Sequence, residues 1–408
     1  MLRATKFLFD DYELSNSRST VTFHYHAEFE TGDEVAFQEN LTFSESLPNP
    51  KNNPSLAQAL HFYHIIAGVS YYKAHLAAEI GSHGLDPWAA ETMSRVYRRG
   101  LGEFIYMNEL SPTDIVSFEP EMMQELPTTD RTAQGSVWLV PIGGGKDSLM
   151  TTTIIEQSNQ EFDTLRINPN SWVGRQLDEI GAPQRLIERK FDDFLISDKK
   201  QYRGHVPVTA IVSAAAVIVA VASGHHAVVF SNEASADEPT VDDYQGMAIN
   251  HQWAKSTEAE ELIQTWISRY ISADLEYFSL LRAMSELDIA EVFAQAVLPR
   301  YSGLWSSSNT NFRHDAPDKL DWDLTSSKTC TVFLLLAPFA ERAVLIEEFG
   351  GNPFALEANH ETWFQLLGQT EVKPFECVAT IDEMRQAWAL AADSDIWPEL
   401  QSINPSGV

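Results

Sequence analysis

Residues 137–148 limit the possible folds of this chain more than any other segment, because they combine three structural signals. Residues 137–142 are apolar and predict a buried strand. Glycines occupy positions 143, 144 and 145, and Lys146, Asp147 and Ser148 then open a helical pattern. A glycine turn between a strand and a helix is typical of α/β folds, in which backbone N–H groups at the helix start bind anions such as phosphate.

The order of strands and helices around this segment supports the same fold class. Further strands are expected at 164–167, 182–191 and 227–230, and they alternate with helical patterns at 206–222, 256–279 and 288–297. We therefore predict an α/β domain whose parallel sheet carries helices on both faces, as in the adenine nucleotide alpha hydrolases. The apolar run at 206–222 is shorter than a comfortable membrane span, so we interpret it as a buried helix and expect no membrane insertion.

The two ends of the chain differ from this central pattern. Residues 21–29 alternate between apolar and polar side chains, and a turn and a return strand at 34–43 follow, which predicts a small antiparallel sheet. Helical patterns follow at 55–80 and 87–107, and residues 329–391 are mostly helical. We predict three parts: an N-terminal α+β domain at 1–130, a nucleotide-binding domain at 131–328, and a helical C-terminal region at 329–408.

The charge balance and the cysteine content restrict the partners and the location. The chain has 58 acidic and 28 basic residues, a formal net charge of −30, and such a surface repels nucleic acid. A small anionic substrate can still bind if positive side chains gather in one cleft. The two cysteines, Cys330 and Cys377, cannot form a disulfide framework, and residues 1–11 lack a signal-peptide pattern. We therefore expect a cytoplasmic protein, and the sequence does not predict its oligomeric state.

The glycine segment differs from a Walker A loop, which requires Gly at the position of Val140 and Ser or Thr at the position of Asp147. It resembles instead the pyrophosphate-binding loop of the ATP-pyrophosphatase family, Ser-Gly-Gly-x-Asp-Ser, with Gly143 at the Ser position. Members of that family cleave ATP between the α- and β-phosphates and transfer AMP to a substrate oxygen. The resemblance implies ATP and Mg²⁺ as cofactors. It assigns phosphate binding to Gly143, Gly144, Gly145 and Ser148, added positive charge to Lys146, and Mg²⁺ binding to Asp147.

A second polar loop follows the strand expected at 227–230, and ligands of parallel sheets bind beyond the carboxyl ends of strands. It begins with Ser231, Asn232 and Glu233. We predict that Ser231 and Asn232 contact the cofactor and that Glu233 holds a substrate amide or the metal ion. The same three residues also fit an Asx-type turn with no ligand.

Two further groups in this region are candidates for proton transfer and charge. His251 is a candidate base, or a donor to the carboxylate that is activated, although a lone His in a polar loop is often incidental. Lys255 and Arg313 are candidates for the positive groups that an anionic substrate needs.

The two cysteines lead to different expectations. Cys377 is a candidate acid or base for inverting a stereocentre, because a thiolate can accept a proton on one face while a partner returns one on the other. The alternative is a buried and inert thiol. Cys330 opens the apolar run at 331–337, and we expect it to be buried.

Several segments point in order along the chain to one family: 67–74, 100–104, 205–210, 230–235, 250–252, 336–339 and 373–377. Together with the glycine loop, they resemble the bacterial UDP-N-acetylmuramoyl-L-alanyl-L-glutamate epimerase (MurL) family across nearly the whole chain. The resemblance implies conversion of the terminal L-Glu of a UDP-muramoyl dipeptide to D-Glu in peptidoglycan synthesis, with release of AMP and diphosphate. The family often has additional cysteines before the 331–337 run, whereas this chain has Cys330 alone, so a cysteine cluster there is in doubt.

The implied chemistry is physically reasonable. A free carboxylate makes the neighbouring Cα–H hard to remove, because a second negative charge would develop beside the first. Adenylation neutralises the carboxylate and lets the carbanion spread onto a carbonyl oxygen as an enolate. The protein must then supply donors to the enolate and one or more bases of suitable pKa. We assign these tasks to His251, Cys377, Lys255 and Glu233.

Two other functions stay open at this point. One is a different adenylate-forming enzyme with the same loop, such as an amide ligase. A tRNA thiolase would need a basic face and paired cysteines, and an amidotransferase would need a glutaminase-like cysteine segment; the sequence shows neither. The other is a nucleotide-binding regulator that has lost catalysis, against which the intact Lys146, Asp147 and Ser148 argue.

Overall fold

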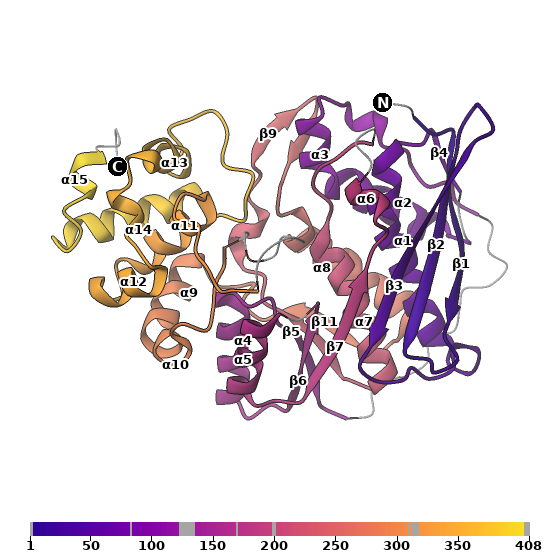
Figure 1. The fold of residues 1–408 in the computed structure, drawn as a ribbon, viewed down its shortest axis with the longest axis horizontal. Coiled ribbons are helices and arrows are strands. Elements are labelled where there is room, and N and C mark those ends of the chain that lie inside the picture. Colours follow the sequence, from indigo (N-terminus) through magenta and orange to yellow (C-terminus); the bar gives the residue numbers. More distant parts are fainter. Residues whose placement is uncertain are drawn as a thin grey trace.

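The computed structural model describes residues 3–81, 84–121, 135–168, 170–197, 201–308, 311 and 318–403, without the side chains of 196–197. One nine-stranded sheet crosses the larger part of the molecule (Figure 1), in the order β11-β8-β5-β6-β7-β3-β2-β1-β4. In chain order its strands are β1 (Lys6–Leu14), β2 (Thr20–Glu28), β3 (Glu34–Phe43), β4 (Glu79–Ile80), β5 (Trp138–Pro141), β6 (Phe162–Ile167), β7 (Gln184–Lys190), β8 (Ala227–Phe230) and β11 (Glu276–Ser279). A separate hairpin contains β9 (Val241–Tyr244) and β10 (Met247–Ile249).

The sheet is mixed rather than purely parallel. Strands β11, β8, β5, β6 and β7 run parallel, as the sequence predicts. The N-terminal hairpins extend the same sheet, because β3 pairs antiparallel with β7 from Asn40↔Lys190 to Phe43↔Ile187. A buried ion pair strengthens this junction: Arg189 Nε lies 2.9 Å from Glu39 Oε1. The predicted boundary near residue 130 lies outside the described residues, and the division into three domains stays a prediction.

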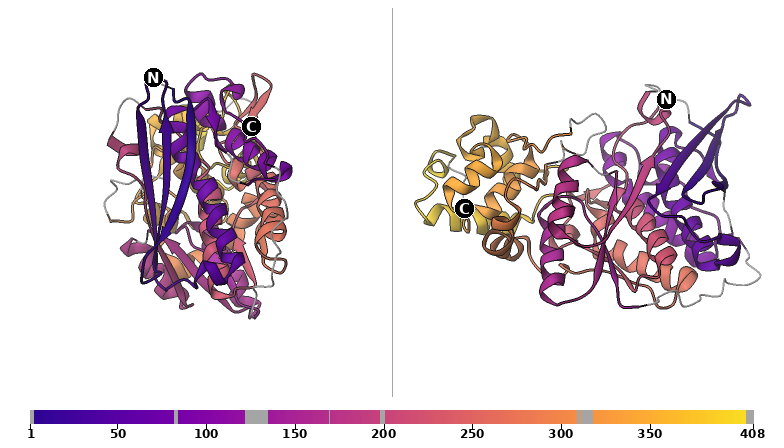
Figure 2. Two further views of the ribbon diagram at one scale, coloured as in Figure 1. Left: turned by 90° about the vertical axis from the view of Figure 1, so that its right-hand side faces the viewer. Right: turned by 60° about the horizontal axis from the view of Figure 1, so that its bottom comes forward.

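Helices cover both faces of the parallel half (Figure 2). Alternate strand residues point to opposite sides, so that Val228 and Tyr277 enter one core and Ala227 and Val229 the other. The first core is closed by α1 (Pro54–His75), α2 (Pro87–Gly100), α7 (Val208–Ser223) and α8 (Thr257–Trp266). The second is closed by α4 (Lys146–Gln157), α5 (Ser171–Ile180) and α9 (Glu286–Val292), and it continues into the C-terminal helices.

The apolar run expected to be buried is helix α7. It begins after Pro207 and ends at Gly224, which adopts the left-handed conformation (φ 75°) that favours glycine at a helix end. Its side chains pack between the sheet and α1. None of the described helices combines the length and the hydropathy that a bilayer span requires.

Three predicted boundaries were wrong. The helix expected at 55–80 ends at His75, and residues 79–80 form β4 instead. The pattern at 87–107 is broken at Leu101 into α2 and α3 (Gly102–Met107). The pattern at 256–279 contains α8, the π-helical turn Ile267–Ile271 and then strand β11. Strand β11 has only four residues, too few for alternation to distinguish a strand from the end of a helix.

The N-terminal strands have one buried face, as their alternation predicts. In β2, the residues Val21, Phe23, Tyr25 and Ala27 are buried, while the residues between them are only half-buried. Strand β1 pairs with β2 on one side and contains an irregularity between Phe9 and Tyr12. On its other side, β4 pairs only with Lys6 and Phe7.

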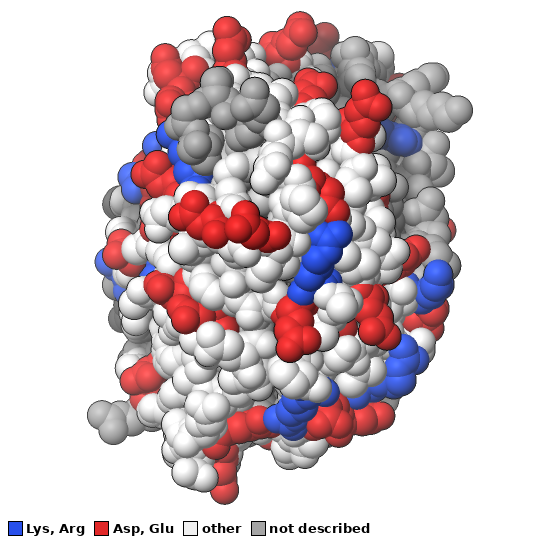
Figure 3. Space-filling model, turned by 90° about the vertical axis from the view of Figure 1, so that its left-hand side faces the viewer, with Lys and Arg blue, Asp and Glu red and all other residues white. Residues whose placement is uncertain are grey.

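The C-terminal region is helical, as predicted, and forms the orange and yellow end of the molecule in Figure 1. Its helices are α11 (Ser327–Leu336), α12 (Arg342–Phe349), α13 (His360–Leu366), α14 (Ile381–Asp393) and α15 (Leu400–Ile403). Trp363, Trp397 and Phe354 pack together in its core, with ring centroids 5.1 to 5.3 Å apart between Phe354 and each tryptophan. On the outer face of this region, acidic side chains are spread widely, and basic side chains lie among them without forming a patch (Figure 3).

Candidate active site

The glycine loop has the geometry of an anion-binding turn. Gly145 is the N-cap of α4 and has no side chain that could cap the helix, so the N–H groups of the first turn, apart from that of Lys146, which donates to Ser307, face outward. Gly144 has a φ of +92°, and a Cβ at this position would lie 2.6 Å from the Trp172 ring, so only glycine fits. A Cβ on Gly143 would meet open space. Ser148 donates its hydroxyl to the Gly145 carbonyl at 3.0 Å, within the loop itself.

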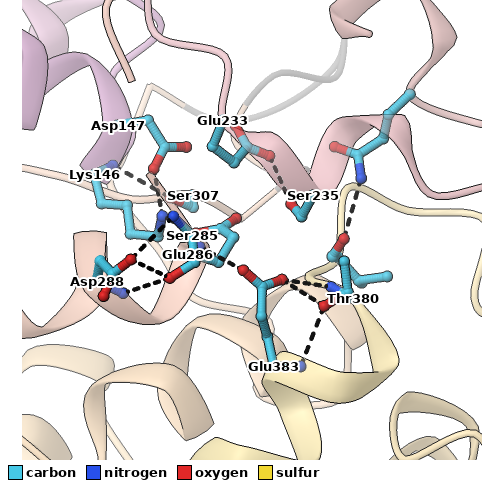
Figure 4. A network of polar contacts seen from close by, with 12 residues as sticks. Lys146, Asp147, Glu233, Ser235, Ser285, Glu286, Asp288, Ser307, Thr380 and Glu383 are labelled. Carbon is cyan, nitrogen blue, oxygen red and sulfur yellow. Dashed lines mark hydrogen bonds and ion pairs between the residues drawn. The ribbon is translucent and has the colours of Figure 1, made fainter. Parts of the chain in front are cut away.

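Lys146 is fully buried and lies among carboxylates (Figure 4). Its ammonium group contacts both Asp147 and Glu286. Burial alone would lower the pKa of Lys146, but the charges of Asp147 and Glu286 outweigh burial and raise the pKa above its ordinary value. For Asp147, burial opposes ionisation, and the nearby Lys146 charge nevertheless lowers its pKa. For Glu286, burial prevails and raises the pKa.

Three carboxylates surround this ammonium group and form a possible cation site. Oxygens of Asp147, Glu233 and Glu286 all lie within 4.8 Å of one another. Glu286 is the first residue of α9 and follows strand β11, so it occupies the carboxyl end of the sheet together with the glycine loop. Carboxylate oxygens are the ligands that Mg²⁺ prefers, so the donor set fits that ion.

The loop after β8 is fixed by hydrogen bonds to its neighbours. Glu233 Oε1 accepts from Ser235 Oγ at 3.0 Å, and Asn232 Nδ2 donates to Ser279 Oγ at 2.9 Å. Asn232 therefore ties β8 to β11, and its contact with a cofactor stays a prediction. Ser231 Oγ is buried without a hydrogen-bond partner among the described residues.

A second cluster surrounds Cys377, which lies in the loop between α13 and α14 and keeps partial exposure. Lys255 Nζ donates to Cys377 Sγ at 3.2 Å. His251 lies close enough to Cys377 to influence its charge, and it contacts Glu103 of α3 through Nδ1. The cluster thus runs from the Glu103 carboxylate through the His251 imidazole to the Cys377 thiol. The Lys255 ammonium group contacts the sulfur.

The charges in this cluster favour a thiolate facing an imidazolium. Burial would raise the pKa of Cys377, but Lys255 and His251 outweigh it and lower the pKa to about 6. Burial would lower the pKa of His251, whereas its hydrogen bonds to Cys377 and Glu103 raise it to about 9. Burial and the neighbouring charge on His251 lower the pKa of His205 to about 4. The Cys377 thiol is therefore the group in this site with the character of a base at neutral pH.

The two clusters form one continuous site. The pKa of Lys255 is raised by Cys377, Glu233 and Asp147, although burial opposes the rise. The charge of Lys328, at the start of α11, lowers the pKa of both Asp147 and Cys377. Arg282 holds the loops in place, because it donates to the backbone oxygens of Glu233 and Lys255 at 2.9 and 2.6 Å.

The C-terminal helices close the site from the opposite side. Gln252 Nε2 donates to the Val378 carbonyl at 3.1 Å, next to Cys377. The backbone N–H of Glu286 donates to Glu383 Oε1 of α14 at 2.7 Å (Figure 4). Ser307, in the connection to the C-terminal region, accepts from the Lys146 backbone N–H at 3.4 Å.

The structure places most of the predicted residues together. Lys146, Asp147, Glu233, Lys255, His251 and Cys377 all take part in the two clusters. Cys330 is buried, as expected, and burial raises the pKa of its thiol. Arg313 lies outside the described residues.

The sequence interpretation missed four polar residues of the site: Glu103, His205, Glu286 and Lys328. The sequence predicts a helix through residue 279 where the structure has β11, and for this reason it does not indicate that Glu286 follows a strand. Glu103 and His205 lie in two of the segments noted for their family resemblance, which was the available signal.

Comparisons with known proteins identify the family of this chain. The family model described as the MurL N-terminal domain matches residues 1–280, and the MurL C-terminal domain matches residues 304–406. A UDP-N-acetyl-alpha-D-muramoyl-L-alanyl-L-glutamate epimerase from Micromonospora is 34% identical over 97% of this chain and 88% of its own length. Proteins of the same name from Salinispora tropica and Xanthomonas oryzae are 33% and 35% identical, over 98% and 85% of this chain and 88% and 77% of their own lengths. With family models and relatives spanning both the glycine loop and the Cys377 loop, the chain belongs to the MurL family.

Proposed function

We propose that this chain epimerises the terminal L-Glu of UDP-N-acetylmuramoyl-L-Ala-L-Glu to D-Glu, using ATP to activate the glutamate carboxylate as an acyl-adenylate. Family membership and the names of the relatives support the epimerase reaction. The observation that carries the mechanism is the continuity of two clusters: a phosphate-type loop with carboxylates, and a thiol flanked by Lys255 and His251. A UDP-linked substrate is soluble, which fits the expected cytoplasmic location.

The first cluster fits a nucleotide with its metal ion. The glycine N-cap of α4 leaves N–H groups of the first turn for phosphate, and the open space at Gly143 lets an anion approach. Asp147, Glu233 and Glu286 would hold Mg²⁺, which shields phosphate charge when bound. The buried Lys146 ammonium already contacts Asp147 and Glu286 and supplies part of the positive charge that these carboxylates require.

The second cluster fits removal of the Cα proton. Once the carboxylate is adenylated, the Cys377 thiolate accepts the Cα proton, and Lys255 donates to the enolate oxygen. Lys255 and Lys328 also supply the positive charge that an anionic substrate needs within a protein of net charge −30. A proton returned to the opposite face gives the D-glutamyl adenylate, and water then cleaves it to D-Glu and AMP.

The test is an incubation with ATP, Mg²⁺ and UDP-N-acetylmuramoyl-L-Ala-L-Glu in D₂O, followed by hydrolysis and chiral analysis of glutamate. We expect D-Glu that carries deuterium at Cα, together with AMP and diphosphate. AMP without D-Glu would instead indicate a ligase or hydrolase, and absence of AMP would indicate a regulator. Cys377→Ser should keep AMP formation and lose deuterium incorporation.

A further inference from the structure

We propose that Glu103 is a positioning residue that keeps His251 protonated and thereby keeps Cys377 in the thiolate form. This inference deepens the proposed function and rests on it, because it concerns the base of the same site. It assigns a role to a helix of the N-terminal part, α3, which lies far from both the glycine loop and Cys377 in the sequence.

The contacts form a linear relay across three separate segments. The Glu103 carboxylate contacts His251 Nδ1, and the hydrogen bond from Gln252 Nε2 to the Val378 carbonyl holds the loop of His251 against the loop of Cys377. The side chains of Glu103 and His251 are 17% and 13% exposed, so water weakens their interaction less than at an open surface. In such an arrangement, the carboxylate orients the imidazole and stabilises its charged form.

A second histidine, His205, helps to decide which of the two imidazoles carries the positive charge. The ring centroids of His205 and His251 lie 4.6 Å apart, and His205 Nδ1 lies 3.5 Å from Glu103 Oε2. Two imidazolium groups so close would repel, and Lys73 and Lys255 further oppose protonation of His205. The single carboxylate therefore supports one charged imidazole, on His251, and leaves His205 neutral.

The effect on the thiol follows from the charges that face it. Cys377 is surrounded by Lys255 from the loop before α8, His251 from the loop after β10, and Lys328 from α11. Removing the charge of Glu103 lowers the pKa of His251, so that the thiol loses one of these cations near neutral pH. Its pKa, about 6 in the native chain, then rises. A rise of about one unit would reduce the thiolate fraction at pH 6 about fivefold.

The experiment measures the rate of alkylation of the full chain by iodoacetamide between pH 4.5 and about 9, the range in which thiols of this kind titrate. Cys330 is buried, so alkylation reports on Cys377, which Cys377→Ser verifies. We expect Glu103→Gln to move the midpoint upward by about one unit. The control is Glu276→Gln, which removes an exposed carboxylate 3.9 Å from His226 and should not move the midpoint. An unchanged midpoint in a folded Glu103→Gln protein would overturn the proposal.

A double-variant comparison separates positioning from a general structural effect. His251→Gln should raise the midpoint as Glu103→Gln does, and Glu103→Gln should then cause no further rise in the His251→Gln background. A further rise would show that Glu103 acts on the thiol by another route and would overturn the relay. If Glu103→Gln folds poorly, Glu103→Asp replaces it in the same comparison. The expected upward shift of the alkylation midpoint is then smaller.

The same three residues could instead bind a metal ion, since donor atoms of Glu103, His205 and His251 lie within 4.8 Å of one another. Stoichiometric zinc in the purified protein, lost in Glu103→Gln, would overturn the relay in favour of a metal site. The alkylation assay needs neither ATP nor substrate. A shifted midpoint without D-Glu formation would therefore refute the proposed function alone, and D-Glu formation without a shift would refute the relay alone.

Discussion

Lys255 allows the sharpest test of the electrostatics around Cys377. Its Nζ lies 3.2 Å from the sulfur. Two unit charges at that distance interact by about 1.3 kcal/mol at the dielectric constant of water, and by about 5 kcal/mol at an effective value of about 20. These energies correspond to about one and about four pKa units. Lys255→Met should therefore raise the thiol pKa from about 6 to at least about 7.

The assay is the pH dependence of Cα deuterium incorporation into glutamate. In the native chain the base is active as a thiolate, so the rate should rise with pH through about 6. Lys255→Met should move the acid limb upward by at least about one unit, whereas Lys255→Arg keeps the charge and should leave the limb in place. A lower rate in Lys255→Met with an unmoved acid limb would refute the electrostatic argument and leave Lys255 only a contact to the substrate.

Other perturbations test the remaining parts of the structure. Glu286→Gln should raise the Mg²⁺ concentration for half-maximal AMP release at least about tenfold, without changing Cys377 alkylation. Gly144→Ala should lower the free energy of unfolding by about 2 kcal/mol in urea titrations, because of its φ and the close tryptophan ring, while Gly143→Ala changes it by less than about 1 kcal/mol. Glu39→Gln removes the charge that pairs with Arg189 at the β3–β7 junction. It should lower the free energy of unfolding by about 3 kcal/mol. The control is Glu45→Gln, because the Glu45 side chain is 65% exposed in its ion pair with Arg185; this change should lower the free energy of unfolding by less than about 1 kcal/mol. Equal losses of stability in the two variants would refute the role of burial.

Local signals in the sequence predicted most of the elements that build the site. The strand, glycine turn and helix at 137–148 form as expected, because the turn chemistry and the helix start act within a few residues. The buried face of β2 follows from its alternation. The long-range pairings were not predictable in this way: the contact between β3 and β7 joins Asn40 to Lys190, and no local pattern encodes it.

The candidate site was predicted where a side chain lies beside a recognisable motif. Lys146 and Asp147 belong to the glycine loop, and Cys377 lies in a segment that resembles the family. Glu103 could not be assigned a role, because its function depends on the approach of α3 to His251. Its charge matters only in that tertiary arrangement, whereas in the sequence it is one of 58 acidic residues.

The shortness of β4 affects how the molecule avoids self-association. Because β4 pairs with only two residues of β1, most of the outer side of β1 has no strand partner among the described residues. Such an edge can recruit a strand from another molecule and start aggregation. Here β1 carries Asp10, Asp11 and Glu13 along that stretch, and its irregularity after Phe9 interrupts a flat pairing surface. The end of the sheet farthest from the active site thus carries charge and a distorted backbone, and both oppose edge-to-edge pairing with a strand of another molecule.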